Sequence, residues 1–169
     1  ASDVYKRQSW GYSRSNCRSL VEEKLAADRT ELEDLRGRYL AAPMQILSVT
    51  LEPNGNGRDF DFIPRFSAGL PQGYELNFYL IDNAGARKLI FQHGGYVSGT
   101  DTNLRLYLPR QELVTSYPAI EFDRQYSLET TVTVSIGSRK IDGWLRQELV
   151  DDVFPSSERT HSLRTQIKL

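Results

Sequence analysis

Hydrophobic residues recur along the chain with two different periods, and the change between them falls near Pro43. Before that point, apolar residues alternate between spacings of four and three, with Asp28 in the seam, which is typical of one face of an α-helix. These residues are Val21, Leu25, Leu32, Leu35 and Tyr39. After that point, apolar and polar residues alternate one by one, which is typical of half-buried strands. The pattern predicts one amphipathic helix followed by a β domain.

The predicted helix covers residues 19–42. Ser19-Leu20-Val21-Glu22 has the sequence of a capping box, in which the Ser hydroxyl and the Glu carboxylate satisfy amides at the start of a helix. Pro43 prevents the helix from continuing. Residues 9–18 are expected to be a disordered or truncated lead-in.

The apolar stripe of this helix needs a partner, because an isolated helix of about 20 residues is marginal in water. One candidate is the β domain, reached through the short link at residues 41–43. Another is an identical helix in a second chain, or a longer coiled coil that extends upstream. Asp28 would be costly in a self-paired seam. We therefore expect docking within a monomer, with a helix-mediated dimer as the alternative.

The β domain is predicted to cover residues 44–154. Short alternating strands separated by Gly, Pro and Asn turns, with no helical crossovers, favour an antiparallel β-sandwich over a parallel α/β fold. A closed barrel remains an alternative. The last strand is expected at Ile141–Leu145, and residues 155–169 are expected to form a loose tail. The expected core is Phe60, Phe62, Leu76, Phe78, Leu80, Leu106, Leu108, Leu128, Val132 and Val134.

Residues 1–8, Ala-Ser-Asp-Val-Tyr-Lys-Arg-Gln, resemble translated sequencing adaptor, the end sequence that a transposase inserts during DNA library preparation. We therefore expect residues 1–8 to be an artefact and the natural N-terminus to be missing from this sequence. Any signal peptide, anchor or domain further upstream would be missing from this fragment.

An alternating strand at Leu104–Leu108 enters Pro109 and then a corner that ends in Glu112-Leu113. A further alternating segment follows at Tyr126–Val132. This arrangement resembles the late strands of bacterial immunoglobulin-like sandwich modules, and the likeness extends over Ile46–Gly143. The resemblance implies an antiparallel immunoglobulin-like sandwich in a module of a larger protein, and such modules are mostly non-catalytic.

Charge and motifs exclude several classes of protein. The net charge is −1, which offers no electrostatic footprint for nucleic acid. No apolar run approaches the roughly 18 residues of a membrane span. Cys17 is the only cysteine, so neither an internal disulfide nor a Cys-based zinc site is possible. No phosphate-binding or dinucleotide-binding loop is present, and we expect no cofactor.

Candidate chemistry is sparse. Asp59 and Asp61 lie beside Asn54 and Asn56 and are a possible calcium site, although we interpret them as the solvent face of a strand. His93 does not form a metal-ligand spacing with any other histidine, and no nucleophile elbow accompanies it. The sequence therefore assigns no catalytic residue and no metal ligand.

Aromatic residues offer the main functional candidates. Several fall near predicted strand ends and loops, where exposed rings can stack on a sugar or anchor a protein partner. The alternative is that they are buried or cover sheet edges. These candidate contact residues are Tyr79, Tyr96, Tyr107, Tyr117 and Trp144.

The sequence predicts a non-catalytic binding or protein-interaction module of a larger bacterial protein. Its partner would be a protein or a carbohydrate. The alternatives are a hydrolase that uses carboxylates on a β-sandwich and a structural oligomer assembled through the helix. We expect a location in the cell envelope or outside the cell rather than in the cytoplasm.

Overall fold

The computed structural model describes residues 2–68, 73–95, 104–136 and 143–169, with side chains described except at 2–16, 95 and 143–146. The chain divides into two compact units. The helical unit comprises residues 1–42 and 138–155. The β unit comprises residues 43–137 and 156–169.

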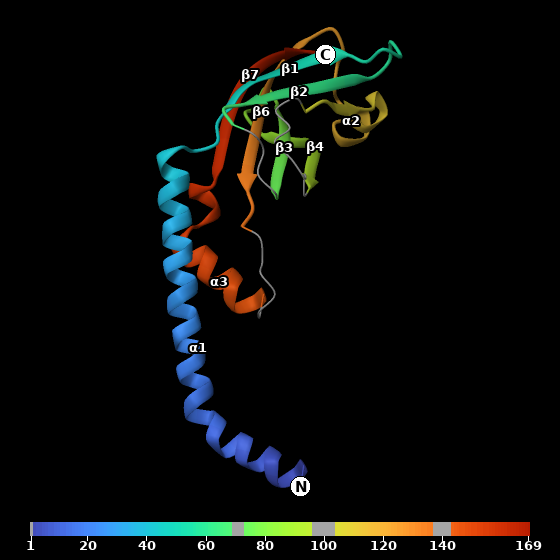
Figure 1. Cartoon of the computed structure of the whole chain (residues 1–169). Coiled ribbons are helices and arrows are strands. Elements are labelled where there is room, and N and C mark those ends of the chain that lie inside the picture. The colour runs from blue at the N-terminus through green and yellow to red at the C-terminus, as the bar shows by residue number, and fades with distance from the viewer. Residues whose placement is uncertain (1, 69–72, 96–103, 137–142) are drawn as a thin grey trace. The chain divides into compact units, whose positions relative to one another are not determined.

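The helical unit contains α1 (Ser2–Ala41), which packs against α3 (Gly143–Val153) (Figure 1). Leu32 of the apolar stripe is fully buried. The Arg29 guanidinium lies 2.7 Å from an Asp152 carboxylate oxygen, which ties the two helices together at the surface. Part of the stripe therefore packs within the chain, in a unit with a helix that the sequence did not predict, whereas Val21 is 46% exposed.

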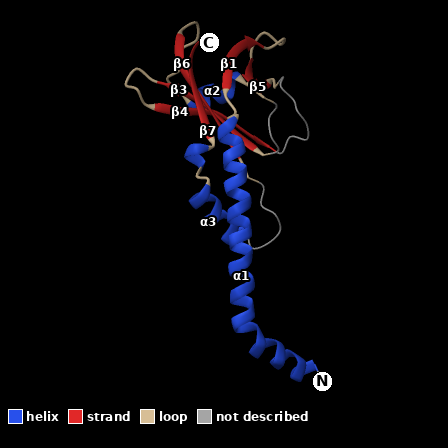
Figure 2. Cartoon of the chain, turned by 60° about the vertical axis from the view of Figure 1, so that its left-hand side comes forward, coloured by secondary structure: helices blue, strands red, loops and turns tan. Residues whose placement is uncertain are grey.

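The first helix is longer than predicted. It begins at Ser2 rather than at Ser19 and runs without interruption to Ala41 (Figure 2). The predicted lead-in at 9–18 is therefore helical, and Ser19 has no free helix terminus to cap. Residues 2–18 contain no proline, so no residue in this stretch prevents a helix from continuing.

The predicted strand at Ile141–Leu145 is wrong, because Gly143–Val153 is helical. Within α3, Leu149 and Val150 are buried, and Phe154 just beyond it packs its ring against Tyr39 with centroids 5.4 Å apart. Apolar residues from Leu145 recur at spacings of four, which suits a helix that covers another helix.

The β unit consists of two antiparallel sheets. The first has the order β1-β2-β5, formed by β1 (Ile46–Pro53), β2 (Phe60–Phe66) and β5 (Leu106–Leu108). The second has the order β4-β3-β6-β7, formed by β3 (Tyr74–Ile81), β4 (Arg87–Gly95), β6 (Gln125–Val134) and β7 (Thr160–Lys168). A short helix, α2 (Arg110–Ser116), follows β5, and a 3-10 turn, η1 (Ser156–Glu158), precedes β7. The prediction of antiparallel strands after an N-terminal helix is confirmed.

Facing side chains of the two sheets share one core. Phe62 of β2 stacks on Phe78 of β3 with ring centroids 4.5 Å apart, and Phe91 of β4 tilts against both rings. Eight of the ten predicted core residues are buried, whereas Phe60 and Val134 are only half-buried.

The predicted loose tail at 155–169 is wrong, because most of it forms β7. This strand pairs with β6 from Gln125↔Lys168 to Thr133↔Thr160. Ile167 is its only buried hydrophobic residue. Its side chains are mostly polar, so the sequence lacks the apolar alternation that marks a half-buried strand.

β1 and β7 meet where the two sheets approach each other. Nδ1 of His161 on β7 accepts a hydrogen bond from the Ile46 backbone N–H of β1 at 3.0 Å. The register of β1 shifts between Ile46 and Ser48, and Leu47 between them is 60% exposed, whereas Ile46 and Val49 are buried. The apolar alternation of β1 therefore begins at Val49 rather than at Leu47.

Candidate functional site

One open hollow of about 370 Å³ lies on the β unit. The end of β1, the β1–β2 turn, the start of α2, the loop before β6 and the end of β7 contribute to it. We call it the β1–β2 hollow. Its charged lining residues are Glu52, Arg58, Asp59, Arg110, Asp123 and Lys168. Its larger apolar lining residues are Leu51, Pro53, Phe60, Phe122 and Leu169.

Asp59 joins three segments at one side of the hollow. One carboxylate oxygen accepts from the Arg110 backbone N–H at 2.9 Å. The other accepts from the Asn56 side-chain amide at 2.6 Å and from the Tyr107 hydroxyl. These bonds attach the β1–β2 turn to β5 and to the first residue of α2.

The same hydrogen bonds stabilise the ionised form of Asp59. The Tyr107 hydroxyl is the largest influence, followed by the Arg110 N–H and the Asn56 amide, and together they hold the pKa of Asp59 below its ordinary value. The bond to Asp59 in turn raises the pKa of Tyr107. Asp59 is therefore an ionised acceptor with its donors already in place, rather than a proton donor.

The β1–β2 turn is held by its own side chains. The Asn54 side-chain oxygen accepts from the Asn56 N–H, and the Asn56 side-chain oxygen accepts from the N–H groups of Arg58 and Asp59. Gly57 has φ +72°, in the left-handed region where a Cβ is unfavourable. The turn thus presents Arg58 and Asp59 to the hollow from a defined backbone.

Two aromatic rings, Phe60 and Phe122, also line the hollow. The Arg110 guanidinium lies 3.7 Å from the centre of the Phe122 ring, within the range of a cation–π contact. The Phe60 and Phe122 rings are nearly parallel, with centroids 6.3 Å apart. The next residue, Asp123, has φ +63° and donates its N–H to the Leu169 carbonyl at 2.7 Å.

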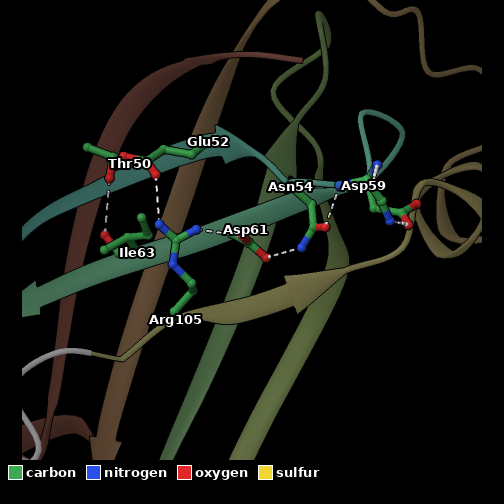
Figure 3. Close-up of polar contacts among 8 residues, drawn as sticks. Thr50, Glu52, Asn54, Asp59, Asp61, Ile63 and Arg105 are labelled. Carbon is green, nitrogen blue, oxygen red and sulfur yellow. Dashed lines mark hydrogen bonds and ion pairs between the residues drawn. The ribbon is translucent and has the colours of Figure 1, made fainter.

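A second polar cluster lies on the outer side of the first sheet (Figure 3). The Arg105 guanidinium lies 2.6 Å from Asp61 and 2.9 Å from Glu52. Asp61 also accepts from the Asn54 amide at 3.1 Å and is 4% exposed. The bonds to Asp61 and Glu52 raise the pKa of Arg105. Arg105 therefore covers a carboxylate that would otherwise be buried without a cation.

The two candidate calcium ligands are directed to different partners. Asp59 accepts from Tyr107, Arg110 and Asn56, whereas Asp61 accepts from Arg105 and Asn54. The interpretation of Asp61 as a solvent-facing residue is wrong, because Arg105 and Asn54 cover it. Across the described ranges, no group of three or more His, Cys, Asp or Glu is placed to hold a metal ion.

The three aromatic candidates whose side chains the structure describes, Tyr79, Tyr107 and Tyr117, each contact a different partner. Tyr107 is about half exposed and contacts Asp59 beside the hollow. Tyr79 lies on β3, and the Arg87 guanidinium lies 4.0 Å from the centre of its ring. The Lys88 ammonium lies 4.9 Å from the centre of the Tyr117 ring. Tyr96 is outside the described residues. Trp144 is in α3, where its side chain is not described.

Sequence reasoning missed most of the lining of the hollow. Arg58, Arg110, Phe122 and Lys168 come from segments far apart in the chain, and no local pattern brings them together. Phe122 offers the only usable signal, because it is an apolar residue between two acids in a loop, Glu121 and Asp123.

Neither a protein-family model nor a curated protein matches the chain. Among the helices that the structure describes, none is both long and apolar enough to cross a membrane.

Proposed function

We propose that this chain is a non-catalytic binding module, built on an immunoglobulin-like β-sandwich and belonging to a larger protein. The observation that carries the proposal is the state of the acids that line the β1–β2 hollow. Asp59 accepts from three donors, and Glu52 pairs with Arg105. Neither of these two acids is available as a free, proton-donating carboxylate, and Asp123, the third acid of the lining, does not by itself supply the pair of carboxylates that glycoside hydrolysis uses.

Strand order supports the immunoglobulin-like part of the proposal. In immunoglobulin lettering, β1-β2-β5 corresponds to A-B-E and β7-β6-β3-β4 to G-F-C-C′, the order of the sheet in variable-type domains. Tyr126 near the start of β6 accepts a hydrogen bond from the Glu121 N–H at 2.8 Å. This contact matches a tyrosine corner, in which a Tyr of strand F bonds to the backbone a few residues upstream.

The shape of the hollow also supports binding. It is open and has both aromatic and charged walls, which suits contact with a protein segment or a sugar. The partner class under this proposal is a protein or a carbohydrate.

The proposal is tested by probing a random-peptide array and a glycan array with the chain and with Phe122→Ala. Leu89→Ala is the control, because Leu89 is an exposed hydrophobic residue on β4 outside the hollow. We expect saturable binding that Phe122→Ala weakens and Leu89→Ala does not. Hydrolysis of glycoside, ester or peptide substrates that is lost in Asp59→Asn would overturn the proposal, as would an absence of saturable binding.

A further inference from the structure

The β1–β2 turn contains two consecutive Asn–Gly steps, Asn54-Gly55 and Asn56-Gly57. An asparagine that precedes a glycine is prone to deamidation, because the glycine has no Cβ to keep its backbone nitrogen away from the asparagine side chain. That nitrogen attacks the side-chain carbonyl carbon. Gly55 and Gly57 are both exposed, so the surroundings of the two attacking nitrogens can be compared directly.

Hydrogen bonds hold the second step in place. The attacking nitrogen would be that of Gly57, and its N–H donates to the Asn54 backbone carbonyl at 2.9 Å. The Asn56 side-chain oxygen accepts from the N–H groups of Arg58 and Asp59, and the Asn56 amide donates to Asp59 at 2.6 Å. Attack at this step would therefore break the Gly57 bond and displace a side chain that three further bonds hold.

The first step is less restrained. The N–H of Gly55 makes no hydrogen bond within the described part of the chain. A Cβ built on Gly55 would meet nothing within 4 Å, so nothing packs against the backbone on that side. The Asn54 side-chain oxygen accepts from the Asn56 N–H at 3.1 Å, and this donor stabilises the negative charge that the oxygen acquires when its carbon is attacked.

We propose that Asn54 is a site of spontaneous deamidation, whereas the fold protects Asn56. The Gly55 nitrogen loses its proton to solvent and forms a bond to the Asn54 side-chain carbonyl carbon. The bond from that carbon to the amide nitrogen breaks, and ammonia leaves with a proton from water. Water then opens the succinimide ring at either carbonyl, which gives aspartate or isoaspartate at residue 54. The net reaction consumes water and releases ammonia.

The product changes the polar cluster around Asp61 (Figure 3). The Asn54 amide donates to the Asp61 carboxylate at 3.1 Å, and Asp61 is 4% exposed. In the product a carboxylate replaces this donor, so two negative charges face each other beside the Arg105 guanidinium. Isoaspartate also lengthens the backbone of the turn by one carbon. Deamidation should therefore destabilise the cluster.

The test incubates the folded chain, and the same chain unfolded in guanidinium chloride, at one mildly alkaline pH. Peptide mapping by mass spectrometry follows the conversion at each asparagine, with fragmentation that distinguishes isoaspartate from aspartate. Asn83 is the internal control, because it is exposed in a turn but precedes Ala84, whose Cβ hinders the attack.

In the unfolded chain, Asn54 and Asn56 should react at similar rates, because both precede glycine. In the folded chain, Asn54 should react about tenfold faster than Asn56, which is the ratio expected from the cost of breaking one hydrogen bond. Asn83 should react more slowly than Asn54 in both states.

Two variants separate the reaction from its consequence. Gly55→Ala should slow the reaction at Asn54 by about tenfold, since the added Cβ restricts the attacking backbone. The fold should tolerate this Cβ, because Gly55 has open space around it and its φ is outside the left-handed region. Asn54→Asp copies one product and should melt at a lower temperature than the chain. Asn83→Asp makes the same charge change at an exposed turn and should melt nearly as the chain does.

A reaction at Asn56 as fast as that at Asn54 in the folded chain would overturn the proposal. A rate at Asn54 no greater than the rate at Asn83 would also overturn it. Both outcomes come from the unmodified chain, so they do not depend on the folding of any variant. Asn54→Asp melting as high as the chain would overturn the predicted effect on the cluster around Asp61.

Discussion

The Phe62 ring stacks on the Phe78 ring with centroids 4.5 Å apart and planes 11° apart, and this contact joins the two sheets of the β unit. Both side chains are fully buried. Phe62→Ala should therefore remove a large packed surface and leave a cavity, which costs about 3 to 5 kcal/mol of unfolding free energy. Urea denaturation measures this, and Leu47→Ala at an exposed position should change stability by no more than about 0.5 kcal/mol.

Thr130 has a buried hydroxyl without a hydrogen-bond partner among the described residues. It lies on β6 opposite Phe78. Thr130→Val keeps the shape and removes the unsatisfied polar group, so it should raise the free energy of unfolding by about 1 to 2 kcal/mol. Thermal and urea denaturation measure the change. A lower stability for the variant would mean that the hydroxyl has a partner after all.

Most of the core could be predicted from the sequence, because the alternation of apolar and polar residues identifies the inward-facing side chains of a strand with one buried and one solvent-exposed face. Leu76, Phe78 and Leu80 of β3 are the clearest case, and all three are fully buried. Phe60 was misplaced because it borders the hollow rather than the core.

Elements that depend on tertiary context were missed. β7 carries mainly polar side chains, so its sequence has no apolar alternation that would predict a strand. Its backbone pairs with β6 along nearly its whole length, and this pairing forms only in the folded chain. α3 has an apolar spacing of four at Leu145, Leu149 and Val153, which a longer window would have identified as helical. Arg58, Arg110 and Lys168 meet only once the chain is folded, so no local pattern predicts the hollow.

The Asp59–Tyr107 hydrogen bond should make the folding stability fall both at acidic pH and at strongly alkaline pH. The folded pKa of Asp59 is lowered, so its contribution is present above the unfolded Asp value and is lost as pH falls through the folded value. The folded pKa of Tyr107 is raised, so its contribution is present below the unfolded Tyr value and is lost as pH rises through the folded value.

Tyr107→Phe removes this bond. The difference in stability between the chain and the variant should therefore be largest at pH values between the unfolded-state pKa values of Asp and Tyr. It should shrink toward acid and toward strong alkali. Carboxyl carbon NMR should show the pKa of Asp59 closer to its ordinary value in the variant. An equal stability difference at every pH would show that the two groups are not coupled.

Leu32 lies on α1, which packs against α3, and its side chain is fully buried. Leu32→Ala should lower stability by about 2 to 5 kcal/mol, because the cavity forms between packed helices. Sedimentation of the chain and of Leu32→Asp should give a monomer in both cases, with reduced thermal stability in the variant. A dimer that dissociates into folded monomers on substitution would show that the stripe pairs between chains instead.

Arg105 is the only cation paired with the buried Asp61 carboxylate within the described residues. Arg105→Met keeps an aliphatic cover but removes the charge, so the Asp61 carboxylate keeps only its hydrogen bond from the Asn54 amide. Removing one partner of a buried charge destabilises more than the pair itself stabilises. Arg105→Met should therefore lower the melting temperature clearly more than Arg65→Met, which removes an exposed cation from the same sheet.

Adding Asp61→Asn to Arg105→Met removes the uncompensated charge and should recover much of the loss. The thermal melts of the chain, Arg105→Met, Asp61→Asn and the double variant form a double-mutant cycle, and the double variant melting lower than Arg105→Met alone would show that Asp61 is stabilised by something other than Arg105.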